Sequence, residues 1–130
     1  MNSVQVSLLE QSNQLVAAFE SKDKSFNDII NKVDEMTLSL LSDEIPNVKK
    51  YDTIMSIEYL LVRARIQTEI ESLNVKRILS TSNDLPASIK GLFIKRDQYL
   101  AQVSLKLNSI RDEISNLQKV VYCGSNFIRK

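Results

Sequence analysis

The carboxylates are the side chains of this sequence that could provide acid–base chemistry, and some of them occur in pairs. Three acidic pairs occur at adjacent positions: Asp34 and Glu35, Asp43 and Glu44, and Asp112 and Glu113. Two carboxyl groups can act as an acid and a base only when both face the same substrate atoms. Adjacent residues on a helix point about 100° apart. We therefore interpret these pairs as solvated helix surface.

The residues that most enzymes depend on are missing from the sequence. There is no histidine, so histidine acid–base chemistry, Ser-His-Asp or Cys-His nucleophiles and histidine metal ligation cannot be formed. The two glycines, Gly91 and Gly124, are too few for a dinucleotide fingerprint or a phosphate-cradling loop. We predict no catalytic residue, no metal and no cofactor, and hence a protein that is not an enzyme.

The single cysteine and the hydropathy pattern bear on location. Cys123 cannot form an internal disulfide, which fits a reducing compartment, the nucleus or the cytoplasm. It lies near an expected helix end, whereas reactive thiols are favoured at helix starts. No run of about 18 uncharged apolar residues is present, and the first ten residues lack a signal peptide pattern. We expect an intracellular protein without a membrane anchor.

The elements that would position any site are long helices, and the last one has the clearest pattern. Positions spaced alternately by four and three residues are apolar with one exception, Arg96. The apolar members are Ile89, Phe93, Leu100, Val103, Leu107, Ile110, Ile114, Leu117 and Val121. This spacing predicts a helix over about 86–122 with a continuous seam that packs on other helices.

The presence of Arg96 in this apolar seam can be interpreted in two ways. At the edge of a seam, its aliphatic stem can be covered while the guanidinium reaches solvent, and this reading is favoured. A polar residue inside a seam can also fix the register of the helices or select a partner. The neighbouring Asp97 does not decide between them.

A second seam predicts a first helix over about 4–41. Its positions are Leu8, Ser12, Leu15, Phe19, Lys22, Phe26, Ile29, Val33, Met36 and Leu40. The stretch 20–25 could interrupt this helix, since Ser25 can cap a fresh start; a single helix, bent there or not, is favoured. Ser12 and Lys22 are interpreted as a tolerated small residue and a snorkelling lysine. Alternatively, the two weaken the helix so that it can detach.

The middle of the chain predicts a helix over about 53–79. Pro46 ends the preceding helix, a connector reaches about Tyr51, and Asp52 or Thr53 caps the new one. Its apolar residues form two stripes, one of Ile54, Ile57, Leu61, Ala64, Val75 and Ile78 and another of Tyr59, Ile66, Ile70 and Leu73. A helix that is apolar on two sides is usually flanked by neighbours on both. We expect it at the centre of the bundle.

These elements predict an all-α fold, an elongated antiparallel three-helix bundle or coiled coil. Pro86 suits the first turn of the last helix, and Gly124 suits its end. The expected domain spans 1–124, followed by a tail over 125–130. At about 1.5 Å per residue the last helix is roughly 50 Å long, so the molecule should be a rod.

Charge is unevenly distributed. Residues 1–46 carry three basic and eight acidic side chains, whereas residues 47–130 carry fourteen basic and eight acidic ones. Charge pairing between the first helix and the remainder is the favoured explanation. Nucleic-acid binding is the alternative, with candidate contacts near the second connection at Lys76, Arg77, Lys90, Lys95 and Arg96. It is not favoured, because the basic residues are interspersed with acidic ones.

The function expected from these observations is that of a non-enzymatic structural or adaptor subunit acting by helix packing. In length, heptads and Ser/Asn-rich composition the chain resembles small helical subunits of eukaryotic multi-protein assemblies, such as kinetochore, Mediator or vesicle-tethering complexes. The resemblance implies other helical proteins as partners, in a hetero-oligomer or a homo-oligomer. The expected packing and partner interface comprises Phe19, Phe26, Ile29, Val33, Leu100, Val103, Leu107, Ile110, Ile114, Leu117 and Val121.

Residues at the margins of the seams are the candidates for docking. Phe127 and Ile128, followed by two basic residues, could form a short docking peptide, although a frayed terminus is the favoured interpretation. Arg96 is the third docking candidate.

Overall fold

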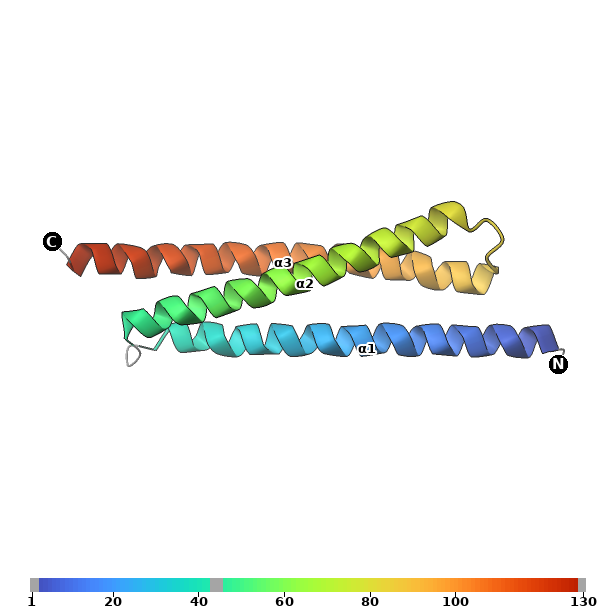
Figure 1. Ribbon diagram of the computed structural model, residues 1–130, viewed down its shortest axis with the longest axis horizontal. Helices are drawn as coiled ribbons and strands as arrows, with labels where there is room; N and C mark the ends of the chain where they lie inside the picture. Colours follow the sequence, from blue (N-terminus) through green and yellow to red (C-terminus); the bar gives the residue numbers. More distant parts are fainter. Residues whose placement is uncertain (1–2, 43–45, 129–130) are drawn as a thin grey trace.

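The computed structural model describes residues 3–42 and 46–128, without the side chains of residues 4 and 122–128. This part of the chain forms three helices, α1 (Ser3–Leu40), α2 (Asn47–Thr81) and α3 (Ala87–Ile128), and contains no strand. The helices form a rod in which α1 and α3 run in one direction and α2 runs back obliquely (Figure 1). The predicted all-α three-helix bundle is confirmed.

The core is one contiguous cluster to which all three helices contribute. Its buried members are Ile30, Val33, Leu40, Ile54, Ile57, Leu61, Ala64, Val103, Leu107 and Ile114. Helix α2 packs most extensively on α3 and also on α1, whereas α1 and α3 contact each other over a smaller area. The middle helix is therefore the centre of the bundle, as expected from its sequence.

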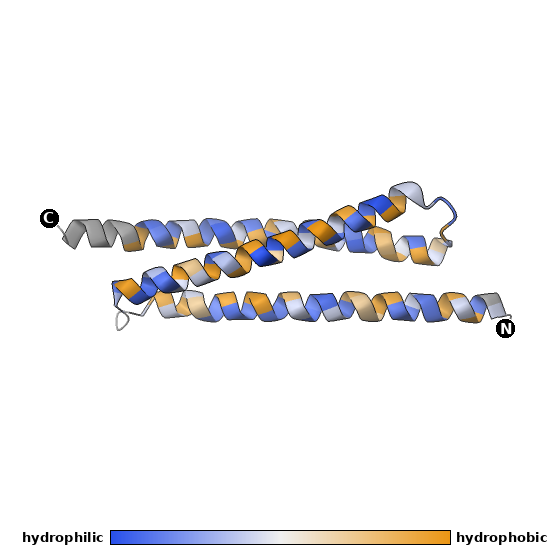
Figure 2. Cartoon of the chain, viewed as in Figure 1, coloured by the Kyte–Doolittle hydropathy of each residue, from blue (hydrophilic) through white to orange (hydrophobic). Residues whose placement is uncertain are grey.

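The two predicted seams are the faces that the bundle buries. Every position of the α3 seam, including Arg96, is buried or half-buried. The same holds for the α1 seam except at Lys22, which is exposed. Hydrophobic segments, coloured orange, alternate with hydrophilic ones along the coloured parts of the three helices (Figure 2). The heptad pattern thus identified the packing faces of the first and last helices correctly.

Helix α1 is continuous, as the favoured single-helix interpretation expected, and the alternative break at 20–25 is wrong. The helical backbone runs through this stretch without interruption. Phe19 and Phe26 on either side of it are both half-buried, and Asp23 within it is bonded to α3. Because these contacts hold both sides of the stretch, the capping potential of Ser25 is not used.

Helix α2 begins at Asn47, about six residues before the predicted start. Pro46 occupies the N-cap position with extended backbone, and its carbonyl accepts the first hydrogen bond from the Lys50 N–H at 3.1 Å. Thr53, the predicted cap, lies inside the helix, where its hydroxyl donates to the Lys49 carbonyl at 2.9 Å. A proline therefore starts this helix in place of a side-chain cap.

Helix α3 continues to Ile128, so its predicted end at Gly124 is also wrong. A glycine inside a helix costs only about 1 kcal/mol relative to alanine, which does not by itself force an end. The start at Ala87 agrees with the expected position of Pro86, whose carbonyl accepts a hydrogen bond from the Lys90 N–H at 2.9 Å.

Candidate functional site

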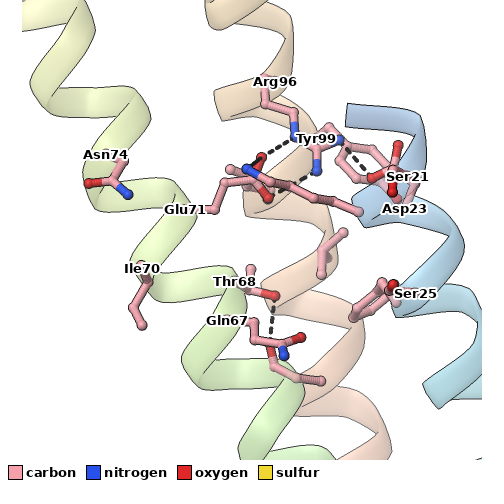
Figure 3. A pocket seen from close by; sticks show the side chains of 15 residues that line it. Ser21, Asp23, Ser25, Gln67, Thr68, Ile70, Glu71, Asn74, Arg96 and Tyr99 are labelled. Carbon is pink, nitrogen blue, oxygen red and sulfur yellow. Dashed lines mark hydrogen bonds and ion pairs between the residues drawn. The ribbon is translucent and has the colours of Figure 1, made fainter. Parts of the chain in front are cut away.

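A buried ionic cluster joins the three helices around Arg96 of α3. Its Nε and Nη2 atoms donate to the two carboxylate oxygens of Glu71 in α2, at 2.6 and 3.0 Å. Its Nη1 donates to Oδ1 of Asp23 in α1 at 2.7 Å (Figure 3). Only 6% of the arginine is exposed, so the interpretation of Arg96 as a snorkelling edge residue is wrong. It lies inside the bundle because both neighbouring helices supply carboxylates.

Two aromatic rings complete the surroundings of the guanidinium. Its carbon lies 4.7 Å from the ring centroid of Phe19 and 4.9 Å from that of Tyr99, distances typical of cation–π contacts. Burial alone lowers the pKa of Arg96, but the hydrogen bonds to Glu71 and Asp23 raise this pKa above its ordinary value. Burial, followed by the charge of Asp23, raises the pKa of Tyr99. The arginine is therefore charged and the tyrosine neutral near pH 7.

Lys22 adds a second cation at the edge of the cluster. Its Nζ lies 3.9 Å from Oε2 of Glu71, and 57% of its side chain is exposed. The lysine therefore snorkels, as predicted. The cluster contains two cations and two carboxylates, and the Arg96–Asp23 pair joins the acidic α1 to the basic part of the chain. At this point the expected internal charge pairing is found.

A groove of about 380 Å³ lies beside the cluster (Figure 3). Leu100 and Val103 of α3 line it, together with polar residues of α1 and α2 that include Ser21 and Gln67. The charged groups of Arg96, Asp23 and Glu71 are bonded to one another. Within the described residues, no group of three or more side chains suited to metal binding is present. The groove is a surface depression, and its described side chains are not arranged for a chemical reaction.

The second apolar stripe of α2 is exposed along its whole length, contrary to the expectation that neighbours flank this helix on both sides. Its members, with the exposed fraction of each, are Val48 (72%), Met55 (67%), Tyr59 (62%), Val62 (43%), Ile66 (47%), Ile70 (55%) and Leu73 (69%). We call this set the outer face of α2.

The geometry of the outer face follows from helical spacing. At about 100° per residue its seven positions lie within roughly 80° of one another, on the opposite side of the helix from Ile57 and Ala64. With a rise of about 1.5 Å per residue the face is roughly 38 Å long. Since α1 and α3 both pack on the core side of α2, neither covers it.

The predicted interface residues lie inside the bundle. Of the eleven, Val33, Leu100, Val103, Leu107 and Ile114 are buried and the others are half-buried. They pack the three helices on one another and leave little surface for another protein. Among the described residues, the outer face of α2 carries the largest set of exposed large hydrophobic side chains on a single helix.

The structure separates Arg96 from the other basic residues that were candidate nucleic-acid contacts. Lys76, Arg77, Lys90 and Lys95 are exposed near the α2–α3 connection, and Nη2 of Arg77 contacts Oδ1 of Asn74 at 3.4 Å. Arg96 does not join them, because its guanidinium is enclosed by carboxylates. The buried Arg96 is likewise no surface for docking. The side chains of Phe127 and Ile128 lie outside the described residues.

Sequence reasoning missed several residues of these sites. Asp23 and Glu71 were not linked to Arg96, although a buried arginine requires acidic partners. Met55 and Val62 were not assigned to the second stripe, although Val48, Met55 and Val62 repeat every seven residues. That heptad repeat was the available signal.

Comparison with known proteins returned no matching protein family, curated protein or solved structure. None of the helices, over their described residues, combines the length and the apolar content needed to cross a membrane. Functional inference consequently depends on the surface of the bundle, and chiefly on the outer face of α2.

Proposed function

We propose that this protein is a non-enzymatic structural or adaptor subunit of a larger intracellular assembly, acting through the outer face of α2. The observation that carries the proposal is an apolar stripe, interrupted by charge only at Asp52 and Glu69, that the described helices leave uncovered. Exposed apolar surfaces of this extent mark sites of association. The resemblance to helical subunits of eukaryotic assemblies supports the same conclusion.

The spacing of the outer face favours a helix as its partner. Tyr59, Val62 and Ile66 are separated by three and four residues, and Ile66 and Leu73 by seven. Such spacing presents knobs and holes to a second helix over the central part of the stripe. A helix laid in this way buries apolar anchors at the same periodic spacing.

Energetics favour a partner that contributes an apolar stripe of its own. Full burial of a large apolar side chain contributes about 1.5 to 3 kcal/mol. The seven residues are more than half exposed on average, so covering them contributes roughly 6 to 12 kcal/mol. Association costs about 4 to 15 kcal/mol in lost freedom. An equal stripe on the partner doubles the favourable term to roughly 12 to 24 kcal/mol, which exceeds most of the range of that cost.

The test is purification of the tagged chain at its natural expression level, with the mass of every stoichiometric companion determined. The variant Ile66→Asp/Leu73→Asp places charges on the outer face without touching the core, and we expect it to lose its companions. Leu105→Asp is the matched control, because Leu105 of α3 is 70% exposed but belongs to no such stripe. Companions retained equally by all variants, or absent from all, would contradict the proposal.

A further inference from the structure

Six of the seven members of the outer face are spaced symmetrically about its midpoint, and Ile70 is the exception. The six, Val48, Met55, Tyr59, Val62, Ile66 and Leu73, are separated by seven, four, three, four and seven residues. This series reads the same from either end. An antiparallel copy of the helix therefore presents apolar residues at matching heights along the same length.

We infer that the outer face of α2 binds the outer face of a second copy of this chain in an antiparallel two-fold arrangement. The inference rests on the proposed function, since it names the partner of the same surface. The two-fold axis passes between residues 60 and 61. Val48 then meets Leu73 of the second copy, Met55 meets Ile66, and Tyr59 meets Val62.

The pairing satisfies the rules for two-fold interfaces and for coiled coils. An interface with two-fold symmetry uses one self-complementary patch on both copies. Spacings of four and three residues supply the knobs and holes by which two helices interlock. Because the core face of α2 is directed away, α1 and α3 of each copy lie on the far side. The two α2 helices occupy the middle of a six-helix assembly.

Charges along one edge of the outer face match the same arrangement. Glu58 and Arg65 are exposed, are seven residues apart, and lie on the same side of the stripe. The midpoint of Glu58 and Arg65 lies about one residue from the midpoint of the apolar series. In the antiparallel pair, Glu58 of each copy therefore faces Arg65 of the other copy. Two ion pairs result.

One contact in this register is unfavourable, and it makes the proposal testable. Asp52 lies opposite Glu69 of the second copy, and both are exposed in the single chain. Like charges across a helix pair oppose association. The substitution Glu69→Lys replaces this repulsion by attraction at two symmetric positions. We expect this substitution to increase the affinity of the dimer. Non-specific association of apolar surfaces does not predict such a gain.

The first experiment is sedimentation equilibrium of the full chain over a wide range of concentration. We expect a species of twice 14.8 kDa. Ile66→Asp should give a monomer with unchanged helicity, and Leu105→Asp should remain dimeric. Glu58→Arg should weaken the dimer about tenfold, and adding Arg65→Glu should restore it, because both ion pairs are then formed again in reverse. A wild-type chain that is monomeric throughout, or a dimer insensitive to Ile66→Asp, would overturn the inference.

The second experiment measures direction by disulfide trapping in a Cys123→Ser background. We expect chains carrying Met55→Cys to cross-link with chains carrying Ile66→Cys, and neither variant to cross-link with itself. Self-linking of Met55→Cys would indicate a parallel pair and overturn the antiparallel arrangement. A monomeric chain whose Ile66→Asp/Leu73→Asp variant nevertheless loses a different stoichiometric companion would overturn the second copy as partner and leave the proposed function intact.

Discussion

The two faces of α2 carry the same kinds of residue and have opposite environments. Ile57 and Leu61 on one face are 0% and 6% exposed, whereas Ile66 and Leu73 on the other are 47% and 69% exposed. Both faces have helical spacing and both extend over most of the helix. Apolar periodicity thus shows which faces of a helix can accept a neighbour, but not which of those faces the described helices cover.

A second difference between the faces is ionic. Glu71, beside the core face, receives two hydrogen bonds from Arg96 of α3, and the same guanidinium bonds Asp23 of α1. Only one relative placement of the three helices brings these groups together. The charges on and beside the outer face, among them Asp52 and Glu69, are exposed to water. The bonds of Arg96 therefore fix the register of the three helices at the core face. No such bond to another helix is found at the outer face of α2 among the described residues.

Removing Arg96 should give the largest loss of stability. Arg96→Ala leaves Glu71 without its bidentate partner in a largely buried position, and breaking a buried pair in this way costs about 3 to 5 kcal/mol. Arg63→Ala, which removes an exposed arginine resting on Tyr59 beside the outer face, should cost less than about 1 kcal/mol. Urea denaturation measures both. Equal losses would contradict the ionic distinction between the two faces.

A matched pair of isoleucines compares the apolar parts of the faces directly. Ile57→Ala creates a cavity at a fully buried site and should cost about 2 to 5 kcal/mol. Ile66→Ala, in the same helix, should change stability by about 0.5 kcal/mol or less. Both are measured at concentrations at which the chain is monomeric. A large loss from Ile66→Ala would mean that something in the isolated chain covers the outer face.

Lys22 tests the exposed margin of the ionic cluster. Its contact with Glu71 is long and its side chain is largely solvated, so Lys22→Ala should cost between about 0 and 1 kcal/mol. The loss should shrink further as salt is added. Thermal denaturation at two ionic strengths provides the measurement, and a loss as large as that of Arg96→Ala would contradict the interpretation of Lys22 as snorkelling.

The smallest effect concerns pH. Burial raises the pKa of Tyr99 above its ordinary value of 10.0, so the unfolded chain releases this proton at a lower pH than the folded one. Stability from this group is therefore complete below about pH 10 and is lost as the pH rises through the folded pKa. Arg96 keeps its charge there, because its own pKa is raised. Tyr99→Phe should lose less stability than the parent above pH 10.

The fold could be predicted from the sequence because its seams are heptads read from local spacing. Leu100 to Val121 in α3 and Phe26 to Leu40 in α1 needed no knowledge of their neighbours. The helix ends were predicted less accurately, because Pro46 was assigned to the end of the first helix and the start of α2 was expected at Asp52 or Thr53. Local signals of similar strength compete there, and six residues of helix depended on the choice.

The sites could not be predicted to the same degree. Arg96 is 25 residues from Glu71 and 73 from Asp23, so their meeting depends on the rotation and the relative shift of three helices. Asp23 even lies in the stretch that suggested a break. Similarly, the spacing of Tyr59, Ile66 and Leu73 shows an apolar stripe but not whether this chain covers it. Only the tertiary arrangement decides both questions.

The ionic cluster also has a consequence for the order of assembly. Helices α2 and α3 are neighbours in sequence, and their pairing brings Glu71 against Arg96, one negative charge against one positive. The arrival of α1 then adds Asp23 and Lys22, again one charge of each sign. A hairpin that forms first and receives α1 last leaves no excess charge at this layer at either stage. If α1 and α3 paired first, Glu71 would not yet be bonded to Arg96. The two cations, Arg96 and Lys22, would then face the single carboxylate of Asp23.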